Sequence, residues 1–143
     1  MIRITRIFRF EAAHALFHHT GACRNIHGHS YVLEVSVAGE PQQAPGSSEG
    51  MVMDFAGLKE IVNTEIINGF DHALILNRNY YDEQSIPESM RGKITWLDKE
   101  PTAENLVLLF AEKLAKKLPP DIRLHHLVLR ETVNSCAEWY GDL

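Results

Sequence analysis

The chain has 143 residues, an apolar fraction of 45% and a formal net charge of −5. This size and composition fit one ordinary globular domain over residues 1–143, and the negative charge gives no electrostatic reason to expect a nucleic acid as partner. No apolar run approaches the roughly 20 residues that cross a bilayer, so we expect no membrane partner. Two cysteines and an N-terminus without a secretory pattern predict free thiols in a cytoplasmic setting.

The first two predicted elements are strands over residues 2–14 and 27–38. In both, apolar residues occupy one parity and polar residues the other, which is typical of a strand with one buried face. His14, His27 and His29 fall on the apolar parity. We therefore expect the three imidazoles on the protected face of a sheet.

Two amphipathic helices follow. The first begins after Asp54 as N-cap and ends at Asn68-Gly69, after a loop over residues 39–50. The second begins after Thr102 as N-cap, carries Glu104 in its first turn, where the helix dipole favours an anion, and ends before Pro119.

Closing strands are predicted over residues 123–131 and 137–141. The order of elements indicates an α+β fold, with two helices packed on one face of a four-stranded antiparallel sheet. Exposed edges of so small a sheet favour closure by oligomerisation. Residues 77–99 show no clear pattern, and a connection of that length is often functional.

Three imidazoles that converge from neighbouring strands are the ligand set of a catalytic zinc site with an open fourth position. His27 and His29 leave the same face of one strand, and antiparallel pairing would bring His14 beside them. Cys23 is then a fourth ligand that closes a structural site, a reactive thiol beside the metal, or a buried apolar residue.

Two further groups could take part in chemistry. Asp71 and His72 form a carboxylate–imidazole pair that could relay a proton, or a plain loop pair at a helix end. Glu131 lies at the end of a predicted strand, on its apolar parity, where a solvated strand end is the alternative. We expect the remaining histidines to lie outside the site and Cys136 to be a small core residue; these histidines are His18, His19, His125 and His126.

With these segments assembled, the chain resembles the 6-pyruvoyltetrahydropterin synthase family, and within it the bacterial 6-carboxytetrahydropterin synthase branch. Six blocks carry the resemblance in family order: FEAAH (10–14), CRNIHGHSY (23–31), VMDFAGLK (52–59), FDHALILN (70–77), PTAENL (101–106) and RET (130–132). The three-residue gap between Cys23 and His27 is similar to that of the carboxypterin branch.

The resemblance implies a tunnelling fold, or T-fold, in which sheets from several subunits close into a barrel as a trimer or hexamer. It implies Zn²⁺ on the three histidines and Cys23 as catalytic base. It further implies a proton relay through Asp71 and His72, a pterin anchored by Glu131, and a pocket lined by Thr102 and Glu104.

The activity implied is conversion of 7,8-dihydroneopterin triphosphate to 6-carboxy-5,6,7,8-tetrahydropterin in queuosine precursor biosynthesis, with release of acetaldehyde and triphosphate. Two alternatives stay open. One is a pyruvoyl-forming synthase, which shares the same ligands and base. The other is a non-catalytic, zinc-stabilised assembly module in which Cys23 is the fourth ligand.

Overall fold

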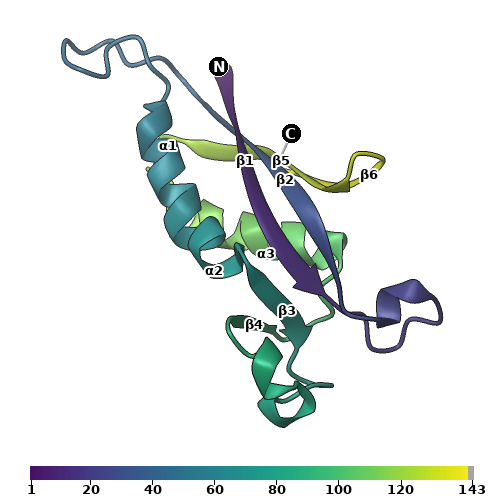
Figure 1. Ribbon diagram of the computed structural model, residues 1–143. Coiled ribbons are helices and arrows are strands. Elements are labelled where there is room, and N and C mark those ends of the chain that lie inside the picture. The colour runs from purple at the N-terminus through teal and green to yellow at the C-terminus, as the bar shows by residue number, and fades with distance from the viewer. Residues whose placement is uncertain (142–143) are drawn as a thin grey trace.

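The computed structural model describes residues 1–141 and consists of one mixed sheet with helices on one side (Figure 1). The sheet has six strands in the order β4-β3-β1-β2-β5-β6. They are β1 (Ile2–His14), β2 (His27–Gly39), β3 (Ala73–Asn77), β4 (Ile94–Leu97), β5 (Arg123–Thr132) and β6 (Ser135–Tyr140). In Figure 1 the long antiparallel ribbon of β1 and β2 passes in front of the C-terminal helix (Ala103–Ala115).

Both predicted helices form, and their predicted N-caps are confirmed, although the first helix continues through the expected end at Asn68-Gly69 to Phe70. The first consists of α1 (Phe55–Val62), a π-helical stretch (Asn63–Ile67) and α2 (Asn68–Phe70). The Asp54 carboxylate accepts the backbone N–H of Ala56 at 2.8 Å. The second helix is α3 (Ala103–Ala115), whose N-cap Thr102 accepts the N–H of Asn105 at 3.1 Å. Within residues 1–141, none of the helices has both the length and the apolar character needed to cross a membrane.

The main core lies between the helices and the inner face of β1, β2 and β5. The Phe10 and Tyr31 rings stack with centroids 4.9 Å apart, and Phe110 of α3 meets Phe10 edge-on. All three side chains are buried, and aromatic pairs of this kind stabilise a core beyond the area that they bury. The same strand face continues from this core to His14, which is also buried.

The prediction of a four-stranded, purely antiparallel sheet is wrong in two respects, although the α+β class with helices on one face is confirmed. β3 and β4 are additional strands, and both pair in parallel, β3 with β1 and β4 with β3. The residues of β3, ALILN, are all buried. A parallel strand that is covered on both faces shows no alternation of apolar and polar residues, and this is why the pattern concealed it.

The segment over residues 77–99 is neither structureless nor loosely attached. Besides β4 it contains two single-turn 3₁₀ helices, Glu83–Ser85 and Glu88–Met90. Ile86 is buried in a second, smaller core with Ala15, Leu74 and Leu76. Since neighbouring residues of a strand point to opposite faces, this second core covers the face of β3 that turns away from the main core.

Candidate metal centre

Strand pairing brings the three predicted metal ligands together. In the β1–β2 register His14 lies opposite His27, and Ala12 lies opposite His29. The Nε2 atoms of His14 and His27 are 3.1 Å apart. One nitrogen from each of the three histidines lies within 4.8 Å of the other two. The predicted convergence of three imidazoles is confirmed, and the group could hold a metal ion.

Backbone carbonyls orient two of these rings. The Nδ1 atom of His14 lies 2.6 Å from the carbonyl oxygen of Pro101, and Nδ1 of His27 lies 2.6 Å from that of Asn25. A carbonyl can only accept, so each Nδ1 carries the proton and donates it. The Nε2 atom of each neutral ring therefore presents a lone pair toward the centre, which is the arrangement that a metal-binding histidine requires.

The centre brings a carboxylate close to ring nitrogens of the three histidines. Glu131 Oε1 lies 3.3 Å from Nε2 of both His14 and His29. His29 Nε2 is buried and, among the residues that the structure describes, has no hydrogen-bond partner of acceptable geometry. Lone pairs in such proximity repel unless a cation lies among them. A tetrahedral ion with Zn–N bonds of normal length needs ligand nitrogens about 3.3 Å apart, close to the spacing of His14 and His27, so these residues fit a metal ion.

Burial favours the neutral, metal-binding form of two of the imidazoles. Desolvation lowers the pKa of His14 and of His29 below the ordinary histidine value, and it outweighs the opposing attraction of Glu131 in both cases. Tyr31, whose hydroxyl lies 3.5 Å from His14 Nδ1, has its pKa raised by burial and so remains a neutral phenol. The centre is thus poised to receive a cation rather than to hold protons.

Glu131 follows the buried Leu129 by two residues, so alternation places both side chains on the same face of β5. The β5–β6 register shifts between Arg130 and Thr132, so that Glu131 is the extra residue of a bulge. Bulges are common beside active sites. The carboxylate is 27% exposed, so one side of it faces the histidines while part remains open to solvent.

Cys23 lies in the loop between β1 and β2, on a short 3₁₀ turn (Ala22–Arg24). It is a free, half-buried thiol. Within the described part of the chain the metal-binding group consists of the three histidines, without the Cys23 sulfur. The loop is closed at its base, where the backbone N–H of Leu16 donates to the carbonyl of Cys23 at 2.9 Å.

Asp71 and His72 occupy the two residues between α2 and β3 and form a pair. Asp71 Oδ1 lies 3.0 Å from Nδ1 of His72 and accepts the backbone N–H of Glu11 at 2.9 Å. The bond from Glu11 is the main reason that the pKa of Asp71 is lowered, with smaller contributions from His72 and Lys93. The carboxylate is therefore a stable anion that holds the ring.

The backbone of His72 is unusual. Its φ of 61° is the left-handed conformation, and His72 is the non-glycine residue with positive φ in the described chain. The His72 N–H donates to the carbonyl of Glu11 on β1, which holds this conformation in place. Strained residues of this kind are concentrated at functional sites. The ring is 77% exposed.

An open cleft of about 550 Å³ has both His29 and His72 among its lining residues. It is lined by residues of β1, β2, β3 and the 77–99 segment, among them Glu11, His29, Ser30, His72, Met90 and Lys93. Ser30 donates to the Glu11 carboxylate at 2.6 Å. The cleft therefore exposes the His72 imidazole next to the strand that carries His29.

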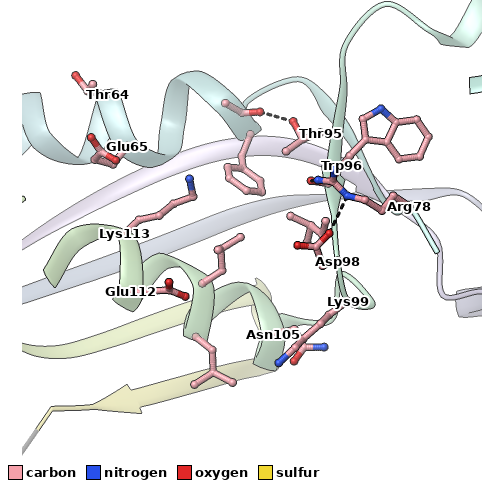
Figure 2. A pocket seen from close by; sticks show the side chains of 15 residues that line it. Thr64, Glu65, Arg78, Thr95, Trp96, Asp98, Lys99, Asn105, Glu112 and Lys113 are labelled. Carbon is pink, nitrogen blue, oxygen red and sulfur yellow. Dashed lines mark hydrogen bonds and ion pairs between the residues drawn. The ribbon is translucent and has the colours of Figure 1, made fainter. Parts of the chain in front are cut away.

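The larger hollow of the molecule is elsewhere. It has a volume of about 780 Å³ and lies between the first helix, β4 and α3, with Phe70, Trp96 and Leu109 among its apolar residues (Figure 2). The charged groups on its rim include Arg78 and Asp98, which pair with each other at 2.9 Å. None of the predicted site residues lines this hollow.

Thr102 and Glu104 contribute less directly than their neighbour. The Thr102 hydroxyl is occupied as the cap of α3, and Glu104 is exposed in the first helical turn. Neither lines the cleft. The group from this segment that contacts the centre is the carbonyl of Pro101, and a backbone carbonyl gives no signal in a sequence.

The histidines that were expected outside the site are not part of the metal-binding group. The prediction for Cys136, by contrast, is wrong. His126 pairs with Glu138 at 2.7 Å, and His125 contacts Arg3. Cys136, expected in the core, is exposed. On β6 the half-buried residues are Ala137 and Trp139, so alternation turns Cys136 to the opposite face.

Known proteins resemble this chain both in sequence and in fold. The sequence profile described as 6-pyruvoyl tetrahydropterin synthase matches residues 3–142. A 6-carboxy-5,6,7,8-tetrahydropterin synthase of Rickettsia bellii is 37% identical over 82% of this chain and 83% of its own. A protein of the same name from Haemophilus influenzae is 32% identical over 97% of this chain and 99% of its own.

Solved structures share the fold. An uncharacterised protein of Wolinella succinogenes superimposes with a TM-score of 0.81 at 20% identity, over 99% of this chain and 98% of its own. The 6-pyruvoyl tetrahydropterin synthase of Caenorhabditis elegans gives a TM-score of 0.70 at 24% identity, over 99% and 96% of the two chains. The expected T-fold is confirmed, and the chain belongs to the 6-pyruvoyl tetrahydropterin synthase family.

Proposed function

We propose that this protein is a zinc-dependent lyase that converts 7,8-dihydroneopterin triphosphate to 6-carboxy-5,6,7,8-tetrahydropterin, with release of acetaldehyde and triphosphate, in queuosine precursor biosynthesis. The names of relatives at 32% and 37% identity support the product. The observation that carries a metal-dependent reaction is the convergence of three imidazole nitrogens beside an open cleft.

Zinc is the metal that this donor set suits best, because three neutral nitrogens match its tetrahedral preference and leave one position open. His14, His27 and His29 would hold it. When bound, the ion would supply Lewis acidity toward the oxygens of the substrate side chain. The carbonyls of Pro101 and Asn25 would keep the rings in place, as hydrogen-bond partners of metal-binding histidines do.

Cys23 is the proposed general base. A thiolate beside a cationic centre is stabilised, so its proton is lost more readily. It would remove a proton from the substrate carbon next to the side-chain hydroxyl. Asp71 would hold His72 through Nδ1, which leaves Nε2 of the exposed ring to carry a proton to or from the substrate.

Glu131 is the proposed anchor of the pterin. The amide and amino edge of a pterin offers two parallel donors, and one carboxylate can accept both. Glu131 lies 3.3 Å from two of the ligands, so a pterin bound to it would have its side chain within reach of the metal centre. Thr102 and Glu104 would line the same pocket beyond the Pro101 carbonyl.

We also propose that the active protein is a homo-oligomer, a trimer or hexamer, in the cytoplasm. β4 and β6 are the edges of the sheet, and unpaired edges favour pairing with another chain. The exposure of His72 is consistent with a site that a neighbouring subunit completes. The two free thiols of Cys23 and Cys136 support a reducing compartment.

The decisive test is product analysis. The zinc-loaded protein is incubated with 7,8-dihydroneopterin triphosphate, and the products are separated and identified. Acetaldehyde and 6-carboxytetrahydropterin in equal amounts would support the proposal. A 6-pyruvoyl product without acetaldehyde would replace it with the second candidate, a pyruvoyl-forming synthase, which the family profile and the Caenorhabditis elegans structure favour.

A further inference from the structure

The loop that carries Cys23 is held against the 77–99 segment by an aromatic cluster. Phe17 stacks on Tyr80 with ring centroids 5.0 Å apart and meets Tyr81 edge-on at 5.5 Å. His18 contacts both Phe17 and Tyr80, at 4.9 and 4.8 Å. Ring contacts of this kind are favourable beyond the area that they bury. The long connection thus fixes one side of the Cys23 loop, and we call this cluster the clasp.

Glu100 fastens the same loop from a second direction. Its Oε2 atom accepts the backbone N–H of Phe17 at 2.8 Å. Its backbone carbonyl accepts the N–H of Thr102 and the side-chain amide of Asn105, at 2.9 and 3.0 Å. Glu100 is therefore fixed to the beginning of α3 by its main chain and to the Cys23 loop by its side chain.

One oxygen of the Glu100 carboxylate lies in an unfavourable environment. Its other oxygen, Oε1, is buried and has no hydrogen-bond partner among the described residues. A buried polar atom without a partner is unfavourable, and those that persist in native proteins call for an explanation. The carbonyl of the next residue, Pro101, orients the ligand His14. A role in holding the Cys23 loop near this ligand would explain why the unpartnered oxygen persists. Two consecutive residues thus connect the Cys23 loop and the metal centre to one point of the chain.

We propose that Glu100 is a positioning residue for catalysis: by holding Phe17, together with the clasp, it sets the place of Cys23 relative to the metal ligand His14. This inference rests on the proposed role of Cys23 as the base. It assigns to the 77–99 segment the task of supporting the Cys23 loop. Displacement of a reacting group by about 1 Å can cost about 10²-fold in rate, so an anchor of this kind affects turnover without contacting the substrate.

The test compares Glu100→Ala with Glu100→Gln in the full-length oligomer. Both variants also carry Cys136→Ser, so that Cys23 is the one remaining thiol. The readouts are zinc content, kcat and KM with 7,8-dihydroneopterin triphosphate, and the rate at which iodoacetamide alkylates Cys23. The amide oxygen of glutamine can still accept the Phe17 N–H, whereas alanine removes the acceptor. Asp98→Ala is the matched control, since Asp98 lies two residues before Glu100 and its removal breaks only an exposed ion pair with Arg78.

We expect Glu100→Ala to keep its zinc and its KM, to lose roughly 10- to 100-fold in kcat, and to be alkylated faster because the loop opens more often. Glu100→Gln and Asp98→Ala should resemble the parent. The proposal is overturned if Glu100→Ala matches the parent in kcat or in alkylation rate, or if Glu100→Gln is as impaired as Glu100→Ala.

A second pair of variants decides the matter should Glu100→Ala fail to fold. Tyr80 is 43% exposed, so its removal leaves the cores intact. Tyr80→Ala should lower kcat and speed alkylation, and Tyr80→Phe should resemble the parent because it keeps the ring; any other result overturns the clasp. A parent protein that makes no product would refute the proposed function, while the alkylation rates would still test the clasp.

Discussion

The two hollows of this protein differ in what their walls offer. The larger one, between the first helix and α3, has an apolar floor and a rim of charges such as Arg78 and Asp98, which neutralise each other. The smaller cleft, beside β1 and β2, adjoins the three histidines, where the buried Nε2 atom of His29 has no hydrogen-bond partner among the described residues. In this protein the candidate site is distinguished by a buried polar atom that lacks a hydrogen-bond partner. The volume of the hollow does not distinguish it.

The strongest test of this difference is removal of one ligand. His27→Ala should lose the metal and reduce turnover by at least about 10³-fold, because a Lewis acid supplies several kcal/mol of transition-state stabilisation. Metal analysis of the purified protein and acetaldehyde release measure the two effects. His126→Ala, which removes a histidine from an ion pair with Glu138, is the control and should keep both. A His27→Ala protein with a full complement of zinc would refute the site.

Removal of the Cys23 thiol separates a base from a ligand. Cys23→Ala should keep its zinc and lose about 10²- to 10⁴-fold in kcat, the usual contribution of a general base. Cys136→Ala, at an exposed position on β6, is the matched control. Loss of zinc and of thermal stability in Cys23→Ala would instead favour the non-catalytic module in which Cys23 closes the coordination shell.

The Asp71–His72 pair is tested by a change of charge alone. Asp71→Asn keeps an oxygen that can accept the Glu11 N–H but removes the negative charge beside His72 Nδ1, so kcat should fall roughly 10- to 100-fold while the melting temperature changes little. Because the pKa of Asp71 is lowered in the folded protein, its contribution to stability is present above the carboxyl's ordinary pKa. It is lost only as the pH falls through the lower folded value. Unchanged kcat would argue against the relay.

The smallest effect is expected in the larger hollow. Lys113→Ala removes a half-buried cation from its wall, and substitutions of this kind usually change stability by no more than about 0.5 kcal/mol. Turnover should stay within about twofold of the parent, measured under the same conditions as the other variants. A large loss here would mean that the reaction involves this hollow as well.

The sequence predicted the centre well because the ligands follow simple strand geometry. His14, His27 and His29 lie at regular spacing on strands with clear alternation, and the observed register brings them together as expected. β3 escaped prediction because a short apolar run that is covered on both faces shows no period. β4 escaped prediction because its four residues, Ile94–Leu97, are too few to establish a pattern. Cys136 was misplaced because its apolar neighbours occupy the opposite parity.

Other contributions to the site could not be predicted from residue types. The carbonyls of Pro101 and Asn25 orient the rings, yet any residue supplies a carbonyl. Glu100 lies 83 positions from Phe17, whose N–H it accepts, and no local pattern reports such a distant bond. The left-handed backbone of His72 depends likewise on its pairing with Glu11 of β1.

The bond between His14 and Pro101 also bears on how the protein matures. All three imidazoles leave the ribosome within one hairpin, whereas the carbonyl that aligns the first of them is 87 positions later in the chain. An ion captured by the nascent hairpin would meet rings that are not yet fixed. Tight binding of an ion would therefore require that α3 has docked, and a chain in which α3 has not yet docked would release the ion readily.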